Sequence, residues 1–249
     1  MKLNVSLKNW KQNTNILNLD VPQELEKTVK TGIAFIDNAL GGEGITPSSA
    51  VLLTGTPGAG KSTLSLQIAN SVTGLGHLAL YNSGEESLFQ IRKVTKRLGF
   101  RHGFVAGQDL MVNDVIEHAK NIKRSNNANK QMFLVCDSIQ TLDDGKYMNG
   151  MVNSMTAVRC TEAITDFCKE TYSIAFLIGQ VTKEGEFSGK QAIKHAVDVH
   201  LHLSIDLAKK SETYGERILE VQKNRFGPAG KRFLVGINDS GLYLKGEVL

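Results

Sequence analysis

The sequence reads Gly55-Thr56-Pro57-Gly58-Ala59-Gly60-Lys61-Ser62 in one glycine-rich stretch, and this stretch decides the fold. An apolar segment, residues 50–53, precedes it, and an amphipathic segment, residues 64–72, follows it. The pattern G-x-x-x-x-G-K-S/T between a predicted strand and a predicted helix is typical of a loop that binds phosphate groups. Its glycines let backbone N–H groups close around an anion, and the positive end of the helix dipole points at the same place.

This loop predicts a binding site for ATP and Mg²⁺. Lys61 is expected to reach the β- and γ-phosphates, and Ser62 is expected to supply an oxygen ligand to Mg²⁺. The expected phosphate-binding residues are Gly55, Thr56, Pro57, Gly58, Ala59, Gly60, Lys61, Ser62 and Thr63. A chance glycine-rich turn would lack the flanking strand and helix, whereas a site that binds a nucleotide without hydrolysing it stays open as an alternative.

Length and composition predict one large α/β domain. The 249 residues can bury a full core, and a hydrophobic content of 41% with 22% charged residues is ordinary for a globular chain. We expect a polar N-terminal arm over residues 1–30 and a single domain over residues 31–249. The net charge of +4 is too small to indicate a nucleic-acid partner by itself.

The sequence disfavours membrane proteins and metal centres built from cysteine or histidine. No apolar run approaches the roughly 20 residues of a membrane span, and the polar N-terminus is not a secretory signal, so we expect a cytoplasmic protein without membrane contact. Cys136, Cys160 and Cys168 form no C-x-x-C pair, which excludes a zinc ribbon. His200 and His202 share one face of a predicted strand, but no third ligand is visible.

Apolar runs of strand length alternate with amphipathic segments along the chain. Strands are expected at residues 50–54, 78–81, 132–136 and 174–178, and helices at residues 31–40, 87–98 and 110–122. Such continuous apolar runs suit parallel strands that helices cover on both faces. From residue 199 onward, short segments at residues 199–205, 217–222, 232–237 and 242–244 predict an antiparallel extension of the same sheet.

Polar residues directly after the predicted strands are the catalytic candidates, because parallel sheets bind ligands at the carboxyl ends of their strands. Asp137 is expected to hold Mg²⁺, although an Asp that caps the next turn is the alternative. Glu85 is expected to activate the attacking water and Glu86 to begin the next helix, unless both merely charge that helix's first turn. Gln180 is a candidate sensor of the γ-phosphate.

The motifs resemble the RadA/Sms family of bacterial DNA-repair ATPases over about residues 31–244. They occur in the family's order: Thr31-Gly32-Ile33, the loop 55–62, Ser83-Gly84-Glu85-Glu86-Ser87, Asp137-Ser138-Ile139-Gln140-Thr141, Gly179-Gln180-Val181-Thr182-Lys183, His195 with Asp198, and Lys223-Asn224-Arg225-Phe226-Gly227-Pro228. The last is the most family-specific. The resemblance implies a RecA-like core, a mainly parallel sheet with helices on both faces, and a hexameric ring or a filament of identical subunits.

The resemblance also implies that Lys223 and Arg225 reach the ATP site of the next subunit and stabilise transition-state charge there. A local surface pair or a DNA contact is the alternative for these two residues. The family's zinc module and Lon-protease-like domain have no counterpart in this sequence, so we expect the motor core alone.

Two segments after catalytic strands, residues 143–158 and 181–194, are expected to be loops that contact single-stranded DNA. The candidate contacts are Arg159, Lys183, Lys190 and Lys194, which suit phosphate binding without sequence preference that weakens with salt. Basic clusters at residues 93–97 and 120–124 are better interpreted as solvated helix faces.

The interpretation that we favour is an ATP-dependent DNA motor that acts on single-stranded DNA in recombination, branch migration or repair. A replicative helicase motor or a strand-exchange recombinase is an alternative on the same core. A KaiC-like assembly switch or recombination mediator, which moves no strand, is an alternative from another class. Recombination or replication proteins are further candidate partners. A catalytically inactive chain is disfavoured, because Lys61, Ser62, Glu85 and Asp137 are all present.

Overall fold

The computed structural model describes residues 15–126, 130–147, 152–180 and 190–248. The helices are η1 (Ile16–Asn18), α1 (Gln23–Glu26), α2 (Ala34–Ala39), α3 (Lys61–Gly74), α4 (Leu88–Arg97), α5 (Val112–Arg124), η2 (Ile139–Thr141), α6 (Ser154–Thr171) and α7 (Lys190–Ala196). The strands are β1 (Ala50–Gly55), β2 (Leu78–Ser83), β3 (Val105–Gly107), β4 (Met132–Asp137), β5 (Ile174–Ile178), β6 (Val199–Ile205), β7 (Arg217–Asn224), β8 (Arg232–Asn238) and β9 (Gly241–Val248).

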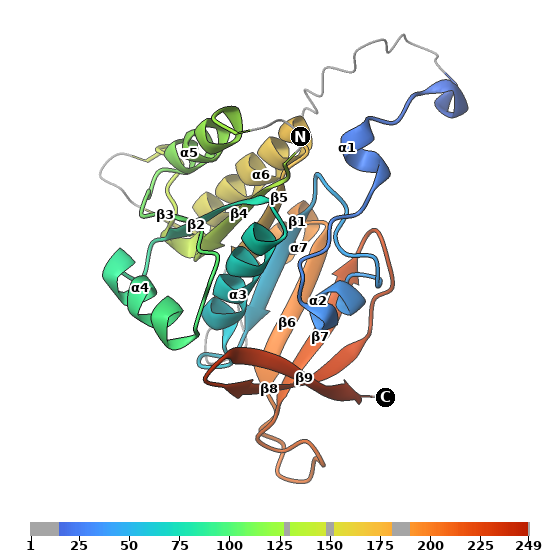
Figure 1. Cartoon of the computed structure of the whole chain (residues 1–249), viewed down its shortest axis with the longest axis vertical. Helices are drawn as coiled ribbons and strands as arrows, with labels where there is room; N and C mark the ends of the chain where they lie inside the picture. Colours follow the sequence, from blue (N-terminus) through green and yellow to red (C-terminus); the bar gives the residue numbers. More distant parts are fainter. Residues whose placement is uncertain (1–14, 127–129, 148–151, 181–189, 249) are drawn as a thin grey trace.

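The strands form one sheet in the order β3-β2-β4-β5-β1-β6-β7-β8-β9 (Figure 1). The six from β3 to β6 pair in parallel, with β1 between β5 and β6. Every residue of β1, β2, β4 and β5 is buried, as continuous apolar runs require when both faces of a sheet are covered. This confirms the predicted fold class, in which the carboxyl ends of the parallel strands meet at one edge.

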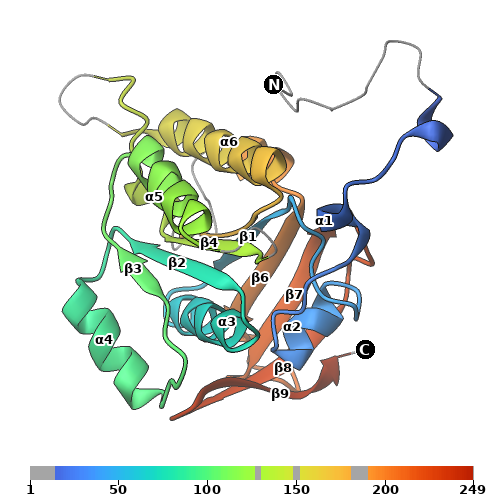
Figure 2. The ribbon, with the colours of Figure 1, turned by 45° about the horizontal axis from the view of Figure 1, so that its top comes forward.

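Helices cover both faces of the sheet. Figure 2 shows α5 and α6 on one side and α2 and α3 on the other. Apolar side chains of α2 and α3 pack with alternate residues of β1 and β4 in one core cluster, and those of α5, α6 and α7 pack with the intervening residues in a second. The two clusters follow from the alternation of side chains along a strand.

The antiparallel extension begins one strand later than the sequence predicts. Residues 199–205 form β6, which pairs in parallel with β1, and only β7, β8 and β9 are antiparallel throughout. The crossover helix α7 immediately before β6 explains this, because it returns the chain to the edge at which parallel strands begin. The last two strands then curve across α3 (Figure 2), where β9 contacts it.

The helix α6 is not among the sequence predictions, which place a loop over residues 143–158. Asn153 caps this helix by accepting hydrogen bonds from Met155 N and Thr156 N, so the loop ends at residue 153. The missed signal was available, since Cys160, Ile164 and Phe167 recur at helical spacing and are buried.

The N-terminal segment 15–28 carries exposed residues and extends from the sheet, until Val29 pairs with Ile45 in an isolated bridge (Figure 1). The division of the chain at residue 30 stays a prediction. Across the described ranges, no helix combines the length and apolar character that a membrane crossing requires.

Candidate nucleotide site

The phosphate-binding loop leaves the end of β1 and leads directly into α3. Gly55 lies so close to β6 that an added Cβ would stand 1.7 Å from the Leu203 carbonyl oxygen, so only glycine fits there. Gly60 has φ of 108° at the N-terminal end of α3, a left-handed conformation that glycine adopts without strain. The loop therefore presents backbone N–H groups and the positive end of a 14-residue helix to one point.

The Lys61 side chain folds over the loop. Its Nζ donates hydrogen bonds to the carbonyl oxygens of Gly55, at 2.9 Å, and of Thr56, at 3.1 Å. Burial lowers the pKa of Lys61, while the nearby carboxylates of Asp137 and Glu85 oppose the shift. The ammonium group thus lies against the loop that is expected to bind the phosphates.

Residues from β6 and β7 form hydrogen bonds to the phosphate-binding loop. Arg217 Nε donates to the Ala59 carbonyl oxygen at 3.0 Å, and Ile205 N donates to Thr56 Oγ1 at 3.2 Å. None of these contacts was predicted, because they join residues about 150 positions apart. They fix the loop to β6 and to the first antiparallel strand, β7.

Asp137 lies at the carboxyl end of β4 and is buried. Its Oδ2 accepts a hydrogen bond of 2.7 Å from the Tyr81 hydroxyl. Burial raises the pKa of Asp137, and hydrogen bonds from Ser62 and Tyr81 oppose the shift. The structure therefore brings Ser62 and Asp137 together, as the predicted Mg²⁺ site requires, and adds Tyr81 as a residue that orients the carboxylate.

Glu85 and Gln180 meet at the same edge of the sheet. Gln180 Nε2 donates to both carboxylate oxygens of Glu85, at 2.7 and 2.8 Å. Gln140, in η2, donates its Nε2 to the Gln180 carbonyl oxygen and accepts from Gln180 N. One amide network thus links the candidate base to the segments that follow β4 and β5.

Glu86 differs from its predicted role as the residue that begins the next helix. Helix α4 begins at Leu88, and Ser87 is its N-cap, with a capping box formed together with Gln90. Glu86 N instead donates to Ser83 Oγ at 3.0 Å. Burial raises the pKa of Glu86, and the carboxylates of Asp137 and Glu85 add to the shift.

A cavity of about 410 Å³ joins these groups. Its lining includes loop residues together with Lys61, Ser62, Glu85, Asp137 and Gln180. This volume lies in the range of small-molecule sites. An anion cradle, the half-buried ammonium group of Lys61 and an oxygen pair at Ser62 and Asp137 fit a nucleotide with Mg²⁺. Ile237 of β8 also lines the cavity, and sequence reasoning missed it, because nothing local to β8 indicates a ligand.

Lys223 and Arg225 make contacts within their own chain. Lys223 Nζ donates to the carbonyl oxygens of Lys194 and Val197 at the end of α7. Arg225 Nη1 pairs at 3.0 Å with Asp198, a buried carboxylate that also accepts from Ala50 N. The Arg225 side chain is 56% exposed. Neither contact tests the role in a neighbouring subunit, which stays a prediction.

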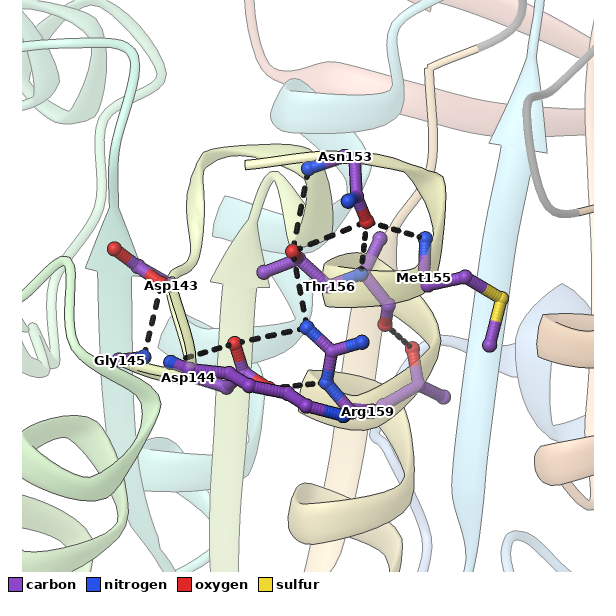
Figure 3. Close-up of polar contacts among 10 residues, drawn as sticks. Asp143, Asp144, Gly145, Asn153, Met155, Thr156 and Arg159 are labelled. Atoms are coloured by element: carbon purple, nitrogen blue, oxygen red, sulfur yellow. Dashed lines mark hydrogen bonds and ion pairs between the residues drawn. The ribbon is translucent and has the colours of Figure 1, made fainter. Parts of the chain in front are cut away.

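The candidate DNA residues are only partly described. Lys183 and the Lys190 side chain lie outside the described residues. The predicted loop over residues 181–194 is wrong from residue 190 onward, where helix α7 begins, and Lys194 is half-buried in that helix. Arg159 is a residue of α6 whose guanidinium pairs with Asp144 and donates to Thr156 Oγ1 (Figure 3). Figure 3 shows these side chains pointing toward one another at the N-terminal end of α6. The guanidinium thus has intrachain partners, and its DNA contact stays a prediction.

Other candidate chemistry is limited in the described part of the chain. All three cysteines are buried and unpaired, and no group of three or more His, Cys, Asp or Glu side chains could hold a metal there. His200 and His202 instead share the Thr54 hydroxyl, at 2.7 and 2.9 Å.

The parallel sheet, the glycine-rich loop and the acidic residues at the strand ends define a RecA-like ATPase domain. Comparison with family descriptions agrees, since the description "ATPase: KaiC" matches residues 29–246. The chain belongs to this KaiC ATPase family.

Similar proteins include two named DNA repair protein RadA, which confirms the resemblance seen in the motifs. That of Aquifex aeolicus (strain VF5) is 38% identical over 224 residues, covering 90% of this chain and 47% of the relative. That of Mycolicibacterium smegmatis (strain ATCC 700084 / mc(2)155) is 36% identical over 220 residues, covering 85% and 44%. This chain thus spans about half the length of these relatives.

A solved structure supports the fold. The KaiC-like protein of the archaeon Pyrococcus horikoshii OT3 superposes with a TM-score of 0.69 at 18% identity, covering 88% of this chain and 98% of that one.

Proposed function

We propose that this chain hydrolyses ATP and couples the reaction to single-stranded DNA as a motor in recombination, branch migration or DNA repair. The observation that carries the proposal is the amide network from Glu85 through Gln180 to Gln140, because it joins the nucleotide cavity to the two segments expected to contact DNA. The relatives named DNA repair protein RadA support the same function.

Each of the residues that line the cavity has its own role in the proposed transfer of the γ-phosphoryl group to water. The loop N–H groups and Lys61 bind the phosphates, and Ser62 with Asp137 would hold Mg²⁺, which when bound neutralises charge between the β- and γ-phosphates. Tyr81 keeps the Asp137 carboxylate oriented. Glu85 positions the attacking water and accepts its proton.

Gln180 would report the state of the nucleotide. Its amide Nε2 is bonded to Glu85 in this structure, and a γ-phosphate beside the cavity offers that N–H group a competing acceptor. An exchange of partners would move the Gln180 backbone, which Gln140 holds through two hydrogen bonds. The shift would then pass to the segments after β4 and β5.

Subunit interfaces complete the proposed site. Lys223 and Arg225 lie at the carboxyl end of β7 and in the turn after it, and a neighbouring subunit in a ring or filament would receive the Arg225 guanidinium at its ATP. An arginine in such a position is typically worth about 10³ to 10⁵ in rate. Exposure of the Arg225 side chain supports this role.

Glu85→Gln tests the proposed chemistry, with Glu86→Gln as its matched control. Glutamine keeps an oxygen for Gln180 but cannot accept a proton, so kcat should fall about 10²- to 10⁴-fold while nucleotide affinity changes little. Glu86→Gln, outside the cavity lining, should keep kcat within several-fold of the unmodified chain. Steady-state phosphate release and nucleotide titration measure both. Near-normal turnover in Glu85→Gln would remove Glu85 from the mechanism.

The KaiC family match also favours a second function, in which ATP controls assembly and no DNA strand is moved. Hydrolysis by such a switch would be slow and indifferent to DNA. This difference separates the two functions experimentally.

A further inference from the structure

A second cavity, of about 660 Å³, lies at the opposite edge of the sheet from the nucleotide site. It is bounded by residues just before β2 and β4, where Leu78 N donates to the Gln131 carbonyl oxygen. The phosphate-binding loop follows the carboxyl end of β1, whereas this cavity adjoins the amino ends of neighbouring parallel strands. A strand of six residues spans roughly 17 Å, so the two cavities are separate.

Four lysines line this second cavity, and they come from separate parts of the chain. Lys27 belongs to the N-terminal segment and Lys30 follows the bridge residue Val29, while Lys123 lies in the last turn of α5 and Lys130 among the residues before β4. Among the described residues that line it, Glu24 is the one carboxylate. The local charge is therefore strongly positive, in a hollow of the size that binds nucleotides and other small ligands.

Three of these ammonium groups form no ion pair or side-chain hydrogen bond with the described residues. Lys123 Nζ donates to the Thr171 carbonyl oxygen at the end of α6, which accounts for its position. Lys27, Lys30 and Lys130 take part in none of the ion pairs or side-chain hydrogen bonds among the described residues. Their charges are thus available to an anion.

Gln131 and His77 line the same cavity. Gln131 Oε1 is buried and has no hydrogen-bond donor among the described residues. Such an acceptor is costly to leave unpaired, so a ligand that brings an O–H or N–H group gains once the Gln131 side chain turns its buried oxygen toward the cavity. His77 lines the cavity beside it, and its ring packs against Phe133.

We propose that this lysine-lined cavity binds phosphate groups of a ligand that also carries a hydroxyl or amino donor for Gln131. A nucleic-acid strand and a free nucleotide share that chemistry. Lys27, Lys30 and Lys130 neutralise the phosphates, while Gln131 accepts from the sugar or base. The site is distinct from the ATP cavity and from the segments expected to contact DNA.

Charge reversal tests the site without touching the catalytic residues. In Lys30→Glu/Lys130→Glu, binding of a labelled 20-nucleotide oligo(dT) and of AMP is compared with that in Lys209→Glu/Lys210→Glu, a control with the same charge change at exposed positions. If the ligand is a strand, oligo(dT) affinity falls at least tenfold in the first variant alone, and the salt slope of log K drops by about 2. If it is a free nucleotide, AMP affinity falls at least tenfold instead. Affinities equal to those of the control for both probes would overturn the proposal.

Residue-resolved labelling gives an answer that does not depend on the variants. Lysine acetylation of the unmodified chain, with and without oligo(dT) or AMP, should show at least threefold protection of Lys27, Lys30 and Lys130, with none at Lys209 and Lys210. Unprotected Lys27, Lys30 and Lys130 would also overturn the proposal. Neither readout uses ATP hydrolysis, so failure of this site and failure of the proposed motor are distinguishable.

Discussion

At the scale of single residues, Thr54 connects the phosphate-binding loop to two histidines. Its hydroxyl contacts His200 Nε2 and His202 Nδ1, and a single hydroxyl can donate to one ring nitrogen while accepting from the other. Burial lowers the pKa of His200 to about 3, and Lys194 adds to this effect. A neutral polar network of Thr54, His200 and His202 therefore lies directly before Gly55.

His200 should make the stability of the fold depend on pH. Its folded pKa lies below the ordinary value of 6.5, so the unfolded chain binds the extra proton. The contribution is complete above pH 6.5 and is lost as the pH falls toward 3, costing about 2 kcal/mol of unfolding free energy between pH 7 and pH 5.

Urea unfolding of His200→Gln across this range measures the contribution. Between pH 7 and pH 5, the unfolding free energy of this variant should fall by about 2 kcal/mol less than that of the unmodified chain. His195→Gln changes an exposed position of α7 and should behave like the unmodified chain. Parallel pH profiles for all three chains would show that His200 titrates normally.

The sequence predicts the residues of the site that form a local motif and misses those that the fold brings to it. Loop residues and Asp137 are recognisable because each lies in a short pattern next to an apolar run. Arg217 contacts the loop from 158 positions away, and its place depends on how β7 pairs with β6. No local pattern encodes that register, so Arg217 and Ile237 become visible only in the structure.

At the scale of elements, Gln67 of α3 ties the curved end of the sheet to the helix that follows the phosphate-binding loop. Its Oε1 accepts from Leu242 N at 2.8 Å, and its Nε2 donates to the Leu242 carbonyl oxygen at 3.2 Å. Since Ile237 of the adjoining strand lines the nucleotide cavity, this tether also shapes the site.

Gln67→Ala should lower the free energy of unfolding by about 1–3 kcal/mol, because the buried N–H group of Leu242 loses its acceptor. It should also weaken nucleotide binding by displacing β8. Gln222→Ala, an exposed change on β7, should stay within about 0.5 kcal/mol. Chemical unfolding and nucleotide titration measure the two effects. Equal stability of both variants would show that Gln67 does not hold β9.

The helices and strands that could be predicted are likewise those with a clear local sequence pattern. The buried strands were predicted because both faces are apolar, and α4 because its apolar residues recur at helical spacing. Strand β3 was missed because its three residues carry too little pattern. The bounds of β6 agree with the prediction, but its parallel pairing with β1 was missed, since a short apolar run does not reveal the partner strand.

At the scale of the whole molecule, the proposal requires subunits that complete one another's sites. A ring or filament has head-to-tail interfaces, in which each subunit offers one surface to the next. Glu85 and Arg225 would then meet only across an interface.

Mixing Arg225→Ala with Glu85→Gln should therefore restore hydrolysis that neither variant has alone. In an equimolar mixture of freely exchanging subunits, about one quarter of the interfaces carry both intact residues. Phosphate release should rise well above the sum of the two variants, provided that circular dichroism shows Arg225→Ala to be folded, since Arg225 also pairs with Asp198. If no mixing ratio exceeds that sum, Arg225 does not act in trans.

The most direct test of the central claim is steady-state ATP hydrolysis with and without single-stranded DNA, with Glu85→Gln as the blank. The account predicts strong stimulation by DNA that the variant abolishes. Hydrolysis at the same rate in both conditions would contradict a DNA-coupled motor and favour the assembly switch.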